Sequence, residues 1–158
     1  MRKRLFEQAK VVQAVPPIVT TTAETLFNNV ASGGTNGIDT KDFDDAMVEV
    51  NLGTMTGDLD VSVVESDTND SSTATAVADI NGVLADLNQF TTAGAEDDDV
   101  YLIGLKAKDL KRYIWVKTVN GDVSSKTYGI NVLLSDADEN VVTQANTVQF
   151  THSEGTPA

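Results

Sequence analysis

The stretch AMVEVNLGTMTGDLDVSVVE, residues 46–65, carries the strongest signal of secondary structure in the chain. Apolar and polar residues alternate in two runs, whose apolar members are Ala46, Val48, Val50 and Leu52, and then Leu59, Val61 and Val63. An alternation of period two is typical of a β-strand with one buried face. Because residues 53–58 supply turn chemistry between the runs, the pattern predicts two strands paired as an antiparallel hairpin.

Further strand-forming runs follow, separated by turn residues. They are VYLIGL (100–105), KRYIWVKTV (111–119), KTYGINVLL (126–134) and, more weakly, NTVQFT (146–151). The NGD at 120–122 predicts a tight hairpin turn. In residues 75–90 the apolar spacing is helical but Gly82 interrupts it, so we expect a loop with at most a short helix. The whole pattern predicts an all-β fold: an antiparallel β-sandwich or barrel of jelly-roll type.

Size and composition limit the classes of protein and partner. The 158 residues have the length of one domain, and 41% of them are hydrophobic, which suffices for one core. Without an apolar run of roughly 18 residues, no membrane partner is expected. The absence of cysteine excludes disulfides and thiolate sites. A net charge of −13 disfavours nucleic acid, and the start MRKRLFEQAK lacks the apolar segment of a secretory signal.

The charge and the prolines are unevenly placed. Four of the eleven basic residues gather at the start of the chain, namely Arg2, Lys3, Arg4 and Lys10. Pro16 and Pro17 lack amide donors and favour extended chain, which argues against a central strand there. We therefore expect an extended basic arm with a Gly-rich connector at 1–36, which docks on a partner, a β-sandwich body at 37–134, and a C-terminal strand and tail at 135–158.

No constellation typical of an enzyme is present. The single histidine, His152, lies in the terminal run THSEGTPA with no nucleophile motif around it. Two loops repeat the first three ligand positions of an EF-hand: Asp67, Asn69 and Ser71, and Asp136, Asp138 and Asn140. Both lack the glycine and the glutamate that complete such a loop, and the acidic run 96–99 is expected to be a solvated turn. We expect a non-enzymatic protein with no cofactor and no metal ion.

Trp115 is the one aromatic residue whose placement bears on binding. If Ile114 and Val116 face the core, the alternation puts Trp115 on the opposite face together with Tyr113 and Lys117. An outward tryptophan suits a subunit interface or a platform for stacking a sugar ring. The alternative is a sandwich buried on both faces at this strand.

Four phrases spread over residues 37–134 carry a family resemblance. They are GIDTKDFDDAMVEVNLG (37–53), DLDVSVVESDTNDSSTATAVAD (58–79), VYLIGLKAKDLKRYIWVKT (100–118) and YGINVLL (128–134). Together they resemble the small decoration or cement proteins that tailed phages encode beside the major capsid protein. The chain departs from that family in its longer tail from Ser135 to Ala158.

The resemblance implies a structural virion protein on the outer capsid surface. Its partners would be the major capsid protein and further copies of itself in a homotrimer, and the basic arm would reach neighbouring capsid subunits. Two alternatives stay open: a β-sandwich module on the virion that recognises carbohydrate or a host surface, and a head-completion or tail-tube protein.

Overall fold

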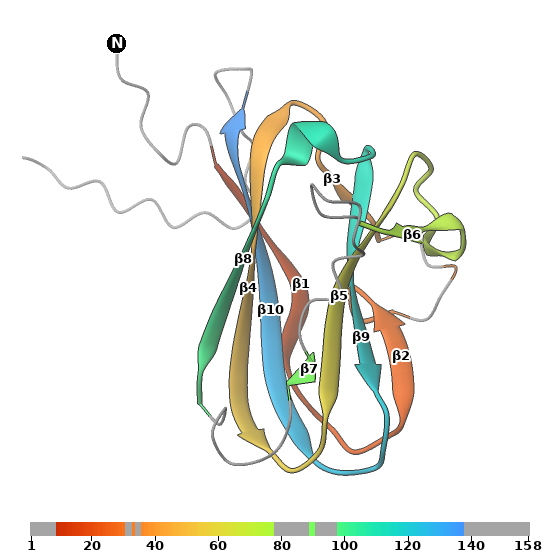
Figure 1. The fold of residues 1–158 in the computed structure, drawn as a ribbon, viewed down its shortest axis with the longest axis vertical. Helices are drawn as coiled ribbons and strands as arrows, with labels where there is room; N and C mark the ends of the chain where they lie inside the picture. The colour runs from red at the N-terminus through yellow and green to blue at the C-terminus, as the bar shows by residue number, and fades with distance from the viewer. Residues whose placement is uncertain (1–8, 31–32, 34–35, 78–88, 91–97, 138–158) are drawn as a thin grey trace, which may run out of the picture.

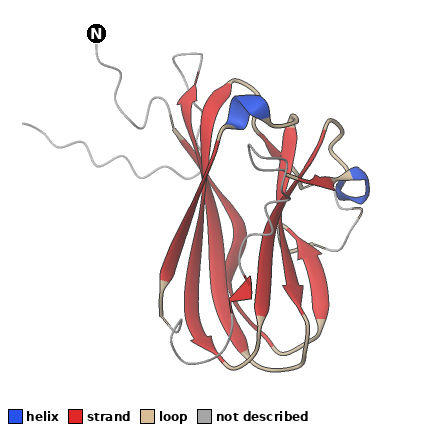
Figure 2. Ribbon diagram, in the orientation of Figure 1, coloured by secondary structure: helices blue, strands red, loops and turns tan. Residues whose placement is uncertain are grey.

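The computed structural model describes residues 9–30, 33, 36–77, 89–90 and 98–137, which form two antiparallel sheets packed face to face (Figures 1 and 2). Sheet A contains, in spatial order, β1 (Lys10–Thr20), β10 (Lys126–Ala137), β4 (Phe43–Met55) and β8 (Val100–Leu105). Sheet B contains β2 (Glu24–Phe27), β9 (Tyr113–Asn120), β5 (Leu59–Ser66) and β6 (Thr75–Ala76). The shorter elements are β3 (Ile38–Asp39) beside β9, β7 (Gln89–Phe90) beside β5, and the 3₁₀ turns η1 (Ser71–Thr73) and η2 (Ala107–Asp109).

The strands pair in nested order along the sequence. The first strand, β1, pairs with the last, β10; within that pair β2 joins β9, then β4 joins β8, and β5 joins β6. The chain is therefore a long folded-back ribbon, rolled so that its pairs alternate between the two sheets. The strand orders β1-β10-β4-β8 and β2-β9-β5-β6 of the two antiparallel sheets are those of a jelly roll, and the predicted fold class is confirmed.

The predicted hairpin within residues 46–65 is wrong. Its first strand, β4, lies in sheet A, whereas the second, β5, lies in sheet B and pairs with β9. The NGD turn at 120–122 likewise joins β9 in one sheet to β10 in the other, so the hairpin predicted there is wrong too. In both cases the two strands turn their apolar faces toward one core, and alternation alone cannot distinguish strands that face each other from strands that lie side by side.

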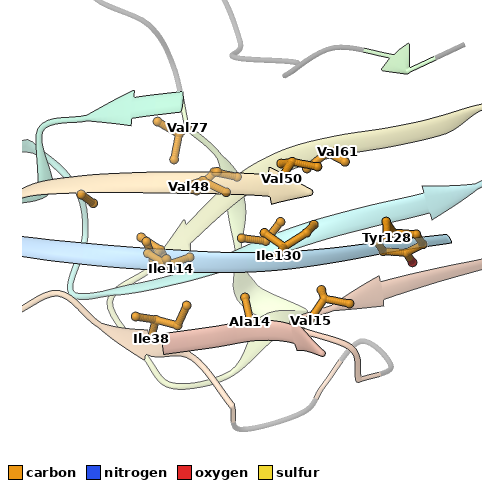
Figure 3. Packing of buried hydrophobic residues seen from close by; sticks show 14 of the residues in the cluster. Ala14, Val15, Ile38, Val48, Val50, Val61, Val77, Ile114, Tyr128 and Ile130 are labelled. Atoms are coloured by element: carbon orange, nitrogen blue, oxygen red, sulfur yellow. The ribbon is translucent and has the colours of Figure 1, made fainter. Parts of the chain in front are cut away.

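The core lies between the sheets and is built from their inward-facing alternate residues (Figure 3). Its fully buried members include Val48 and Val50 of β4, Ile114 and Val116 of β9, and Ile130 and Val132 of β10. Burying each such side chain contributes roughly 1.5–3 kcal/mol. These are the faces that the alternation predicted, so the pattern of buried residues is confirmed for β4, β5, β9 and β10.

The expected arm at 1–36 differs from the structure from Lys10 onward, because residues 10–20 and 24–27 form β1 and β2 of the sandwich. Residues 10–20 form β1, an edge strand of sheet A, and its residues Ala14 and Val15 belong to the core. Pro16 and Pro17 lie where the pairing with β10 shifts register, so their missing amide donors disrupt no regular ladder. An edge strand with such an irregularity tolerates proline, which is why the two prolines did not exclude a strand.

Several sequence-based predictions concern residues outside the described part of the chain. They are the arm residues Arg2, Lys3 and Arg4, the loop or helix over 78–88, the weak strand at 146–151, His152, residues 96–97 of the acidic run, and Asp138 and Asn140.

Candidate interaction surface

The prediction that Trp115 faces outward toward a partner is wrong. Trp115 does point away from Ile114 and Val116, onto the outer face of sheet B, but its exposed fraction is 0%. Val64, its partner across the sheet on β5, is also buried. At this strand the sandwich is buried on both faces, which is the alternative that the sequence left open.

Two loops close over the indole of Trp115. Gly37 lies so close that a Cβ at this position would be 2.6 Å from Trp115 Cζ2. The amide of Gly37 donates to Asn69 Oδ1 at 3.0 Å, and the amide of Gly33 donates to Ser71 Oγ at 2.7 Å. The loop before β3 is thereby tied to the loop after β5. Asn69 and Ser71, two residues of the EF-hand-like spacing, serve in these loop contacts.

Asn28 fixes the start of the first loop. The backbone N–H of Asn28 donates to the carbonyl oxygen of Val116 at 2.9 Å, and its side-chain Oδ1 accepts from the backbone N–H of Val116 at 2.8 Å. One residue therefore satisfies both backbone groups of Val116 where β2 ends. Its Nδ2 donates to the carbonyl of Asn36 at 2.6 Å, which fixes the far side of the loop. These contacts hold the chain across sheet B, above Trp115.

Tyr113 and Lys117, the other two residues predicted for a subunit interface, are half-buried on the same face. The guanidinium of Arg112 lies over the Tyr113 ring, 5.0 Å from its centroid. Arg112 also pairs with Asp39 at 2.8 Å, and this hydrogen bond lowers the pKa of the Asp39 carboxyl. These contacts hold β3 against β9, so this corner offers no open aromatic platform.

The outer face of sheet A has a different character, because it exposes large apolar side chains. Three cross-strand rows define it: Val11, Leu133, Met47 and Gly104; Gln13, Asn131, Glu49 and Leu102; and Gly129, Asn51 and Val100. Val19 of β1 extends the face beside Thr127. Of the five exposed large hydrophobic residues in the described part of the chain, four lie on this face: Val11, Val19, Val100 and Leu102.

A hollow of about 250 Å³ opens on this face around Gly129. Pro17, Asn51 and Gly53 are among the residues that line it. A Cβ at Gly129 would come within 3.3 Å of the Pro17 Cα, so the bulged edge strand passes close over the glycine. Sites for small molecules typically enclose roughly 300–1,000 Å³. The hollow is smaller than that and better suits a protruding side chain of a macromolecular partner.

Among the described residues, no group of three or more His, Cys, Asp or Glu side chains is arranged to hold a metal ion. Within the same ranges, no helix has the length and hydrophobicity required to cross a membrane.

The fold and its surfaces define a jelly-roll β-sandwich with one outer face covered by loops and one open. The PBSX exported protein XepA is similar in structure, with a TM-score of 0.50 at 14% identity over 92% of this chain. This chain spans 43% of the length of XepA, and the likeness shows the fold.

Two other solved structures are less similar. The infectious bursal disease virus VP2 subviral particle has a TM-score of 0.45 at 14% identity over 85% of this chain and 33% of its own. A protein of the disulfide-linked pili of Bacillus endospore appendages has a TM-score of 0.35 at 10% identity, over 85% of this chain and 96% of its own. No protein-family model and no curated protein sequence matches the chain.

Proposed function

We propose that this chain is a structural virion protein that decorates the outer capsid surface of a tailed bacteriophage. It binds the major capsid protein and does so as a homotrimer. The observation that supports the proposal is the jelly-roll sandwich, an architecture that recurs in viral capsid proteins, in a chain whose phrases over residues 37–134 resemble phage decoration proteins. The proposed role requires no catalysis by the protein.

The mechanism is stabilisation by linkage. A protein that binds only the mature arrangement of shell subunits shifts the equilibrium toward that arrangement by its binding free energy. Because one shell offers many equivalent sites, modest affinity at each site gives a large total effect. The contact with the shell comes from the basic segment at the start of the chain.

The basic segment provides the test. Since residues 10–20 are a strand of the body, a deletion that tests docking has to stop before β1. Deletion of residues 1–8 removes Arg2, Lys3 and Arg4 and is expected to abolish co-sedimentation with phage heads that lack this protein. The melting temperature should stay within about 2 °C of the full chain, because surface changes away from the core have small effects.

A charge variant serves as the matched control for the deletion. Arg2→Glu, Lys3→Glu and Arg4→Glu together keep the length and reverse the charge. They should reproduce the loss of binding if the contact is electrostatic, and binding of the full chain should then weaken with added salt. Full occupancy of heads by the deletion variant would refute docking through the arm.

The carbohydrate-binding alternative rested on outward Trp115 and Tyr113. Trp115 is buried, and Tyr113 is half-buried with the Arg112 guanidinium over its ring, so this alternative loses its support. The head-completion or tail-tube alternative is separated by the same sedimentation experiment. A protein of that kind would bind at one vertex or in the tail, so heads would retain a few copies each instead of a full shell.

A further inference from the structure

We propose that the outer face of sheet A, as defined by the three rows above, is the surface through which this chain contacts a second copy of itself. The inference rests on the self-association included in the proposed function, and it adds the location of the contact and the residues that make it.

Exposed apolar side chains gather on the outer face of sheet A. Val11, Val100, Leu102 and Val19 are 48%, 58%, 62% and 65% exposed and lie on one face, at its two edge strands. Monomeric proteins scatter exposed apolar residues singly, and a gathering on one face marks an interaction site. The half-buried Leu133 and Met47 connect the two edges through the row that starts at Val11.

The low charge of the outer face of sheet A also favours contact between copies there. The chain carries a net charge of −13, so two copies repel each other unless they approach where the charge is lowest. On the outer face of sheet A, Glu49 is the acidic residue of the three rows, and its carboxylate accepts the Asn51 amide at 2.9 Å. At the border Asp45 is neutralised by Lys106 at 2.5 Å. The cores of interfaces are depleted of charge in this manner.

The covered outer face of sheet B strengthens the contrast. There the loops over Trp115 and the Arg112–Asp39 pair already occupy the surface with contacts inside the same chain. The outer face of sheet B around Trp115 is therefore not available to a partner, and Asp60, Ser62 and Lys117 place polar side chains on the rest of that face.

The outer face of sheet A is large enough for a specific contact. Strands about 4.8 Å apart with a rise of about 3.4 Å per residue give this four-stranded face about 500 Å². Together with an equal area of the second copy the contact buries about 1,000 Å², which is about the minimum for a specific interface. The hollow at Gly129 provides a place for a protruding side chain at the centre of such a contact.

The experiment measures the solution mass of the full chain by light scattering over a range of concentrations. Two variants place a charge on opposite edges of the face, Val11→Lys and Leu102→Glu. Glutamate is chosen at 102 because a lysine there would pair with its cross-strand neighbour Glu49. The matched controls are Val123→Lys and Val123→Glu, because Val123 is 74% exposed and follows β9 outside both sheets. The melting temperature of each variant establishes that it folds.

The expected result is a mass of at least twice 16.8 kDa for the wild type and for both Val123 variants. Val11→Lys and Leu102→Glu should raise the dissociation constant by roughly a hundredfold or more, since an uncompensated charge is buried in the contact. Two results would overturn the inference: a wild-type monomer at all concentrations, or edge variants that associate as the wild type does.

Co-sedimentation with phage heads separates this inference from the proposed function. If the wild type is a monomer but Leu102→Glu abolishes binding to heads, the face contacts the shell protein, so the inference fails and the proposed function stands. If the wild type associates through this face but never binds heads, the inference stands and the proposed function fails.

Discussion

Replacing Trp115 by alanine should destabilise the fold strongly, because the side chain is fully buried between sheet B and the two loops that cross it. Truncation of a buried tryptophan or phenylalanine to alanine costs about 3–5 kcal/mol, including the cavity that is left behind. One feature lowers the expected value within this range. The indole Nε1 of Trp115 has no hydrogen-bond partner among the described residues, and an unsatisfied buried donor costs about 1–3 kcal/mol.

The orphaned donor makes Trp115→Phe informative. Phenylalanine keeps most of the ring and removes the unsatisfied N–H, so the loss in the free energy of unfolding should be about 1 kcal/mol or less. For a domain of this size, 1 kcal/mol shifts the melting temperature by about 2–4 °C. Trp115→Ala should therefore melt about 6–20 °C below the wild type, and Trp115→Phe within about 4 °C of it.

Calorimetry or denaturant unfolding followed by circular dichroism measures both shifts, with exposed Val123→Ala as the control. An exposed position should change the melting temperature by no more than about 2 °C. If Trp115→Ala melted together with this control, the indole would be exposed to solvent, and both the closure of the loops and the rejection of an aromatic platform would be incorrect.

Two further predictions concern Gly37, in the loop over Trp115, and the ion pair between Asp122 and Lys126. Gly37→Ala should lower the melting temperature by several degrees, because its Cβ would contact Trp115 Cζ2 at 2.6 Å. The control is Gly121→Ala, whose Cβ would have no atom within 4 Å and which should leave the melting temperature unchanged. Equal shifts in the two variants would contradict the close approach of Gly37 to Trp115. Asp122 Oδ1 lies 2.6 Å from the buried Lys126 Nζ, and this hydrogen bond lowers the pKa of the Asp122 carboxyl. The ion pair therefore contributes its full stability above the unfolded-state pKa of about 3.9. The contribution disappears as the pH falls through the lower folded-state pKa. Melting curves of Asp122→Asn should therefore lie below the wild type from pH 5 to 8 and converge with it below about pH 4; a constant difference down to pH 2 would exclude the ion pair as the cause.

The sequence predicted the strands and their buried faces because a period of two records which residues face the core. Val48, Val50 and Ile130 are buried as the alternation requires. It did not predict strand pairing, since β4 and β5 present the same pattern whether they share a sheet or face each other across the core. The nested pairing of β1 with β10 joins residues far apart in the sequence, and no local pattern records such a contact.

The surface residues were harder to predict than the core, and for a physical reason. The burial of Trp115 depends on Gly37 and on the hydrogen bond from its amide to Asn69, which lie far from Trp115 in the sequence. The open face of sheet A could have been anticipated in part, because Val100 and Leu102 alternate in VYLIGL with residues that pack on the core. The missing information was that Val11 and Val19 belong to the same sheet, which follows only when residues 10–20 are a strand.

The position of β1 links the two proposals energetically. The basic segment of residues 1–8 lies just before Ala9 and Lys10, and a fully extended chain of eight residues reaches at most about 29 Å. Arg2, Lys3 and Arg4 are therefore tethered near Val11, at the edge of the face proposed for self-contact. Copies that associate through that face carry several basic segments on one particle. Once the first segment has bound a shell, the others bind as intramolecular steps, and such coupling typically strengthens binding by about 10²–10⁴-fold without any new contact. Self-association and docking thus reinforce each other, and an acidic body that gains little affinity from its own charge can still hold firmly to a repeating lattice.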